Sequence, residues 1–185
     1  MILTPFPEPP AGLQHALRML AMLTHGTEQE RAALGEATAA ELPWDPGSCS
    51  HALRADIWRW CDQVAGWVNR DYAWRPQQMI PSCWPRHRPI ARELPVLAML
   101  RWDAQRATDP RALEEWHRHT LPGFQERMLD RLGDSSCRAG RHQEWPAAAR
   151  HGAHTEPSAA RERAQLLLAD TSGPGGSRRT GQDQR

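Results

Sequence analysis

The sequence contains no lysine, so that all 23 of its basic residues are arginines. They nearly balance 22 acidic residues, and residues 41–137 carry thirteen of each. Proteins that bind nucleic acid usually present a one-sided basic surface, and this middle part of the chain has no such excess. The composition therefore gives no support to a nucleic-acid partner, which is kept only as an alternative.

Long apolar runs are also missing. No segment approaches the roughly 20 consecutive apolar residues of a membrane-spanning helix, so we expect no membrane association. Residues 1–5 have no basic region and a proline already at position 5, unlike a secretory signal peptide. The spacings of the four cysteines are irregular and do not indicate a disulfide framework. We therefore expect a cytoplasmic protein whose thiols are reduced: Cys49, Cys61, Cys83 and Cys137.

Signatures of catalysis are absent as well, because the chain has no glycine-rich phosphate loop, paired-carboxylate motif or zinc-protease motif. A nucleophile pair of Cys83 with His87 or His117 would need an orienting group and an oxyanion site, and the sequence indicates neither. His117 and His119 would point about 200° apart on a regular helix and could not share a site. We expect no enzyme, and we predict no catalytic or cofactor-binding residue.

Nine tryptophans, against two phenylalanines and one tyrosine, are the most unusual feature that is present. Tryptophan supplies a large buried area but needs an acceptor for its indole N–H, so it suits a small helical core. Apolar residues recur at intervals of three and four through residues 53–68, which predicts a helix with one buried stripe. That stripe comprises Leu53, Ile57, Trp60, Cys61, Val64, Trp67 and Val68.

The first 42 residues predict a pair of short helices behind a proline-rich, irregular leader. Leucines at helical spacing indicate a first helix that ends near His25. Thr27 and Glu30 form a capping-box pattern that opens a second helix, which we expect to extend to about Ala40. This pair would either dock on the main domain or act as a separate interaction element.

Further helices are predicted after residue 88. A stripe of Ile90, Leu94, Leu97 and Ala98 contains Pro95, where we expect a kink or a restart. Asp109 and Pro110 begin the next helix, in which Leu113, Trp116 and His117 are expected to face inward. Pro122 is expected to break this helix before a last helix that ends at Gly133.

The predicted fold is therefore all-α, a bundle of three or four main helices over residues 48–133, and no alternating strand pattern is present. We divide the chain into an N-terminal helical segment (1–42), a Trp-rich helical domain (43–142) and a low-complexity, largely disordered tail (143–185). The tail contains one amphipathic patch around Leu166, Leu167 and Leu168.

Residues 43–142 also carry a pattern of tryptophans, prolines, cysteines and histidines that resembles a known family. The pattern consists of Trp60, Trp67, the run Ile80-Pro81-Ser82-Cys83-Trp84-Pro85-Arg86-His87, Glu93-Leu94, Trp116-His117, Leu121-Pro122, Cys137 and His142. It resembles an actinobacterial family of small proteins that is classified only as a domain of unknown function and is often met on plasmids and conjugative elements. The resemblance implies this genetic context but no activity, because none is established for the family.

Two of these cysteines and two of these histidines suggest a metal site. Cys83 and His87 are separated by three residues, and Cys137 and His142 by four. These short spacings allow a local turn to present two ligands to one ion, and Cys2His2 is a usual ligand set for structural zinc. The alternative is a buried free Cys83 beside a hydrogen-bonded His87, with the other two residues in the tail.

The sequence thus favours a protein–protein interaction or accessory protein of mobile-element context, with a partner that the residues do not identify. The alternatives are a zinc-stabilised helical domain with a nucleic-acid-associated role and a small enzyme. Structural zinc is the one cofactor that the sequence suggests.

Overall fold

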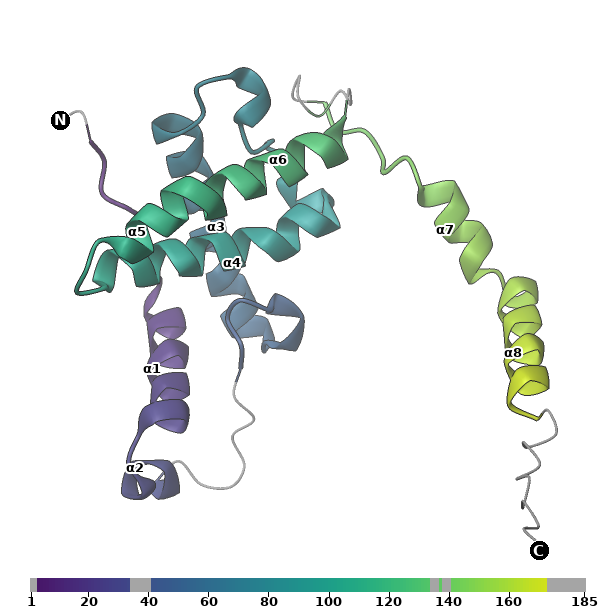
Figure 1. Cartoon of the computed structure of the whole chain (residues 1–185), viewed down its shortest axis with the longest axis horizontal. Helices are drawn as coiled ribbons and strands as arrows, with labels where there is room; N and C mark the ends of the chain where they lie inside the picture. Colours follow the sequence, from purple (N-terminus) through teal and green to yellow (C-terminus); the bar gives the residue numbers. More distant parts are fainter. Residues whose placement is uncertain (1–2, 34–40, 134–136, 138–140, 173–185) are drawn as a thin grey trace, which may run out of the picture. The chain divides into compact units, whose positions relative to one another are not determined.

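The computed structural model describes residues 3–33, 41–133, 137 and 141–172 (Figure 1). All regular structure among these residues is helical, which confirms the predicted all-α class. The chain divides into two units, Met1–Gln143 and Glu144–Arg185. The α-helices are α1 (Ala11–His25), α2 (Glu28–Ala33), α3 (His51–Asp71), α4 (Arg88–Arg106), α5 (Arg111–Glu115), α6 (Leu121–Leu132), α7 (Ala148–Thr155) and α8 (Pro157–Thr171).

Helix α3 lies at the centre of the first unit. Ser50 caps its start, with its hydroxyl oxygen accepting a hydrogen bond from the backbone N–H of Leu53 at 3.3 Å. All seven residues of the predicted stripe are buried, from Leu53 to Val68. The helical periodicity therefore identified the core face of α3 without error.

The proline-rich leader, residues 3–10, packs on α3 and forms part of the core. Phe6 is buried and meets the rings of Trp60 and Trp67 edge-on, at centroid distances of 6.0 and 5.0 Å. The indole N–H of Trp60 donates to the carbonyl of Pro7 at 2.9 Å, and that of Trp67 donates to the carbonyl of Thr4 at 3.0 Å. The leader thus supplies the acceptors that buried tryptophans require.

The N-terminal helical pair belongs to the same unit. Helix α1 packs against α3 through the fully buried Leu13. The predicted capping box is present: the N–H of Thr27 donates to Oε2 of Glu30 at 2.7 Å, and the N–H of Glu30 donates to the hydroxyl of Thr27 at 3.3 Å. Helix α2 is described as far as Ala33, and the rest of its predicted range, 34–40, lies outside the described residues.

Helix α4 follows a connector of two 3-10 turns, Pro76–Gln78 and Trp84–Arg86. It does not restart at Pro95, because the helix is continuous from Arg88 to Arg106 with Pro95 buried inside it. A kink at this proline stays a prediction. The four stripe residues from Ile90 to Ala98 are all buried, as predicted.

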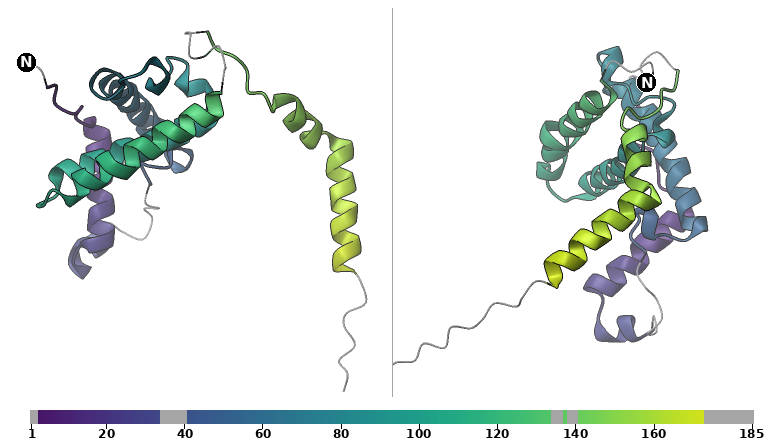
Figure 2. Two further views of the ribbon diagram at one scale, coloured as in Figure 1. Left: turned by 45° about the horizontal axis from the view of Figure 1, so that its top comes forward. Right: turned by 90° about the vertical axis from the view of Figure 1, so that its right-hand side faces the viewer.

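The segment after α4 folds back along it, and α4 and α6 run side by side (Figures 1 and 2). The expected break at Pro122 is wrong. A π-helical turn, Trp116–Thr120, joins α5 to α6, and the backbone stays helical at Leu121. The wider π turn accommodates a proline, which has no N–H to donate and whose ring would collide with a carbonyl of a regular α-turn. His117, which we expected to face inward, is exposed.

Two ionic contacts join α6 to α4. Glu93 accepts hydrogen bonds from Arg127, at 2.9 Å, and from Arg131. Gly133 ends α6 with a positive φ of 49°, a conformation that glycine adopts without the steric cost of a Cβ atom. The three-helix bundle of α3, α4 and α5–α6 therefore has both packed and ionic contacts.

The second unit differs from the predicted disordered tail over its described residues. Helices α7 and α8 lie within it, and the Leu166–Leu168 patch is on α8. Alanine, arginine, glutamate and leucine in this stretch all have high helix propensity, which explains the local structure. None of the described residues 144–172 is buried, so these helices contribute nothing to a core within this unit.

Candidate metal centre

Cys83 and His87 flank the 3-10 turn Trp84–Arg86 at the end of the α3–α4 connector. The turn is closed by hydrogen bonds from the N–H of Arg86 to the carbonyl of Cys83 at 2.9 Å and from the N–H of His87 to the carbonyl of Trp84 at 3.0 Å. Trp84 is buried, and its indole N–H points at a carboxylate oxygen of Asp62 on α3, 3.4 Å away. The tryptophan thereby fixes the turn, and with it both candidate ligands, against the core.

Cys137 and His142 come from the segment that follows α6. Cys137 is buried, with 2% of its surface exposed. The backbone N–H of Gln143 donates to its sulfur at 3.1 Å. A backbone donor of this kind is a common outer contact of thiolate ligands in metal sites.

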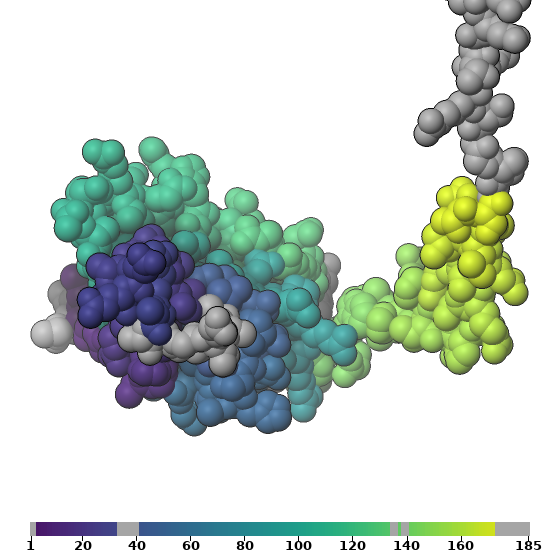
Figure 3. Space-filling model, turned by 90° about the horizontal axis from the view of Figure 1, so that it is seen from below, coloured from purple at the N-terminus to yellow at the C-terminus, as the bar shows by residue number. Residues whose placement is uncertain are grey.

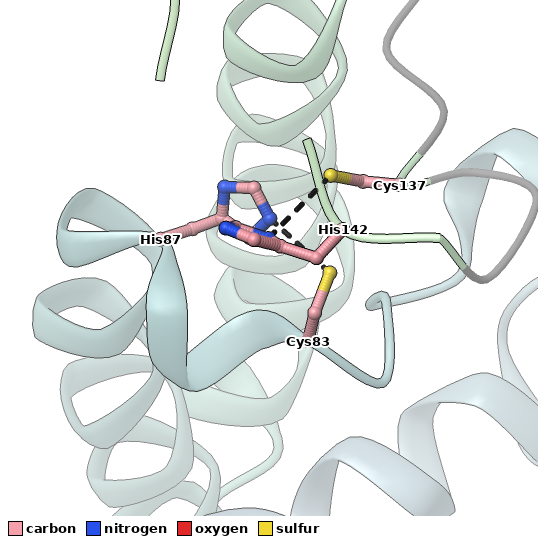
Figure 4. Close-up of side chains that lie close together, drawn as sticks. All are labelled: Cys83, His87, Cys137 and His142. Atoms are coloured by element: carbon pink, nitrogen blue, oxygen red, sulfur yellow. Dashed lines mark hydrogen bonds between the residues drawn. The ribbon is translucent and has the colours of Figure 1, made fainter. Parts of the chain in front are cut away.

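The four side chains converge on one point, as Figure 4 shows. Their candidate ligand atoms all lie within 4.8 Å of one another. Sγ of Cys83 lies 3.3 Å from Nε2 of His87, and Sγ of Cys137 lies 3.9 Å from Nδ1 of His142. The imidazole rings of His87 and His142 are 5.1 Å apart between centroids. The structure thus brings together all four residues that the sequence predicted, from segments about 50 positions apart.

These distances fit a tetrahedral zinc ion. With Zn–S bonds of about 2.3 Å and Zn–N bonds of about 2.0–2.1 Å, a tetrahedron places sulfur and nitrogen about 3.5 Å apart and the two sulfurs about 3.8 Å apart. The two measured S···N distances of 3.3 and 3.9 Å lie on either side of the first value. The two sulfurs lie within 4.8 Å of each other and would need to approach by at most about 1 Å to reach the tetrahedral spacing.

The electrostatics of the group favour a cation. Burial raises the pKa of the Cys83 thiol above its usual value, and the neighbouring Cys137 raises it further. Two thiolates held this close repel each other, and a divalent cation between them removes that cost. Two thiolates and two neutral imidazoles around Zn²⁺ make a site with no net charge, which suits its half-buried position.

Four protein ligands would fill a tetrahedral shell completely. Catalytic zinc sites keep a position for water or substrate, whereas structural sites are closed. The arrangement therefore suits a structural ion that ties the connector before α4 to the segment after α6.

The other residues considered for chemistry lie elsewhere. Nε2 of His117 is 3.1 Å from the hydroxyl of Tyr72 and the two rings stack, so His117 is engaged with a tyrosine. Cys61 is buried in α3, and this burial raises the pKa of its thiol strongly. Sγ of Cys49 donates to the carbonyl of Leu42 at 3.3 Å. Neither of these two cysteines belongs to the metal-ligand group.

A surface groove was not foreseen from the sequence. It has a volume of about 770 Å³ and is lined by α1, the segment around Trp44 and the end of α4. Figure 3 shows the molecule from the side on which α1 and α2 lie. Its walls include Leu17, Leu20 and Trp102, and burial raises the pKa of Asp103 at its edge. The residues that α1 and α4 contribute to it are 77 positions or more apart in the sequence, so no local pattern could have indicated it.

Comparisons of the chain with protein-family models, with curated proteins and with solved structures find no match. The resemblance of residues 43–142 to the actinobacterial family stays a prediction. No helix among the described residues is long and apolar enough to cross a membrane.

Proposed function

We propose that residues 3–143 form a zinc-stabilised helical domain that serves as an interaction or accessory protein. The convergence of Cys83, His87, Cys137 and His142, with all ligand atoms within 4.8 Å of one another, is the observation that carries the metal part of this proposal. Each pair is local, but the two pairs are far apart in sequence. Two such distant pairs would rarely meet at one point by chance.

Zinc at this place would stabilise the folded state directly. The unfolded chain holds no preformed site, so the free energy of metal binding adds to the free energy of folding. The ion would cross-link the α3–α4 connector to the chain after α6.

The interaction role is supported by exposed aromatic and aliphatic side chains on a neutral domain. Trp74 is 92% exposed, and Val96 and Leu100 on α4 are 39% and 46% exposed. Contiguous apolar surface left in water is a common sign of a partner surface, and Val96 and Leu100, four residues apart, lie on the same face of α4. A protein partner suits this surface better than a nucleic acid, whose binding requires a basic excess.

Metal analysis is the decisive experiment for the zinc centre. The full chain, purified without chelator, should contain about one zinc ion per molecule, measured by inductively coupled plasma mass spectrometry. Cys83→Ser and Cys137→Ser should each lose most of this zinc and melt at a lower temperature. Cys61→Ser is the matched control, because it removes a thiol as buried as that of Cys137 but outside the ligand group, and it should keep the metal.

Cobalt substitution provides a second reading of the same site. Co²⁺ bound by two thiolates and two imidazoles in a tetrahedron gives intense visible absorption and a sulfur-to-metal band in the near ultraviolet, and both should disappear in Cys83→Ser. A parent protein with much less than one metal ion, and with a melting temperature that a chelator does not change, would remove the proposal.

The genetic context separates the accessory role from an enzyme. Genes for plasmid transfer or integration beside the coding sequence are the expected finding, because residues 43–142 resemble proteins of mobile elements. A metabolic operon in that position would instead favour a small enzyme.

A further inference from the structure

The metal-ligand group contains the only two thiols among the described residues that are held beside each other. Sγ of Cys83 and Sγ of Cys137 lie within 4.8 Å, and both are free thiols. A disulfide bond needs about 2.0 Å between its sulfurs. The approach required is therefore less than 3 Å, and zinc binding itself would supply up to about 1 Å of it.

We propose that this centre is a redox switch: a peroxide oxidises Cys83 and Cys137 to a disulfide and releases the zinc ion, while the two chain segments stay joined. The inference rests on the proposed zinc centre and adds its regulation. Two features of the geometry carry it, namely the proximity of the sulfurs and their origin in different segments.

The reaction balances with hydrogen peroxide as the oxidant. The thiolate of Cys83 attacks one peroxide oxygen, breaks the O–O bond and becomes a sulfenic acid, and hydroxide leaves. The thiolate of Cys137 then attacks that sulfur, forms the S–S bond and displaces a second hydroxide. Two solvent protons convert the hydroxides to water. The sulfurs lose two electrons to the peroxide, and zinc, left with two imidazoles, dissociates.

The order of attack follows from exposure. Cys83 is half-buried, whereas Cys137 is 2% exposed, so the peroxide reaches Cys83 first and Cys137 resolves the sulfenic acid. The other two thiols have no such partner. Cys61 is 1% exposed and Cys49 is 6% exposed. Oxidation should therefore select the metal ligands over these buried cysteines.

The position of the sulfurs decides what oxidation does to the domain. Each segment contributes one cysteine and one histidine, so the disulfide joins the same two segments that zinc joins. It closes a loop of about 55 residues between Cys83 and Cys137. A site with both cysteines in one segment would form a local disulfide on oxidation and lose the cross-link. In this protein zinc is released on oxidation, but the disulfide keeps the two segments linked.

The experiment uses the full-length, zinc-loaded chain treated with hydrogen peroxide. Zinc release is followed with the chromogenic chelator 4-(2-pyridylazo)resorcinol, and the disulfide is identified by non-reducing peptide mapping. One zinc ion should be released for each Cys83–Cys137 disulfide formed, and a thiol reductant followed by zinc should restore the starting state. Cys61→Ser is the control variant and should behave as the parent does.

Thermal melting in the presence of chelator tests whether the disulfide keeps the two segments joined after zinc is released. The oxidised, zinc-free chain should melt about 10 °C above the reduced, zinc-free chain, the increase expected for cross-linking a loop of this size in a domain of this size. Cys137→Ser provides the contrast, because its oxidation can form no such disulfide and should leave the melting temperature unchanged.

The results separate this inference from the zinc proposal. Zinc in the parent with no disulfide after peroxide, or with sulfinic acid at Cys83 as the end product, overturns the switch and leaves the zinc centre intact. Equal melting temperatures for the oxidised and reduced zinc-free chains overturn the claim that the disulfide replaces zinc as a stabilising link between the two segments. A parent that never binds zinc overturns the zinc centre, and the switch with it.

Discussion

Phe6→Ala is the sharpest test of the leader as part of the core. The Phe6 side chain is 6% exposed, meets two tryptophan rings and lies 5.2 Å from the guanidinium carbon of Arg101. Emptying a buried phenylalanine site usually costs about 3–5 kcal/mol. Each lost aromatic pair accounts for about 0.5–1.5 kcal/mol of that figure. We expect the free energy of unfolding to fall by about 4 kcal/mol.

The same segment offers a matched control. Leu3 is 79% exposed and only three residues away, so Leu3→Ala should change stability by less than about 0.5 kcal/mol. Urea denaturation of both variants, followed by tryptophan fluorescence and by far-ultraviolet circular dichroism, gives the two values. The midpoint of Phe6→Ala should shift strongly at an unchanged slope. If the two variants have equal midpoints, the leader does not pack on α3 and the reasoning fails.

Two further perturbations have expected outcomes. Burial raises the pKa of Glu93, but the hydrogen bonds from Arg127 and Arg131 outweigh it and hold the pKa below its ordinary value of 4.5. The stability that the ionised Glu93 contributes is present above pH 4.5 and is lost as the pH falls through the lowered pKa. Glu93→Gln should therefore flatten the acid limb of a stability–pH curve, and an unchanged limb would contradict the contact. Deletion of residues 152–185 should leave the melting temperature of the first unit within about 1 °C of the parent, because none of the described residues of that stretch is buried. Differential scanning calorimetry measures this temperature, and a loss of several degrees would show that α8 contributes to stability.

Features that depend on neighbours in the sequence were predictable. The α3 stripe followed from spacing alone, because a helix repeats every 3.6 residues and the core selects one face of it. The capping box of Thr27 and Glu30 followed from short-range hydrogen-bonding chemistry. For the candidate metal centre, spacing identified both ligand pairs, but only the three-dimensional structure shows that they meet.

Features that depend on distant contacts escaped the sequence. Phe6 lies in a proline-rich segment with no periodicity, and its burial depends on Trp60 and Trp67, more than 50 positions away. The π turn at Trp116–Thr120 could not be predicted for another reason. A proline usually ends a helix, and a π turn that keeps the helix continuous has no clear sequence signature. His117 was assigned to the core from periodicity, which this turn shifts.

The contact between the leader and α3 has a consequence for synthesis on the ribosome. Its two hydrogen bonds span 53 and 63 positions, and the leader always emerges before the tryptophans that it covers. The leader is therefore already synthesised when Trp60 and Trp67 leave the ribosome, which limits the time for which their exposed rings can aggregate with other chains. A circular permutant that moves the leader to the end of the chain would reverse this order, and would expose the aromatic face of α3 until translation is complete.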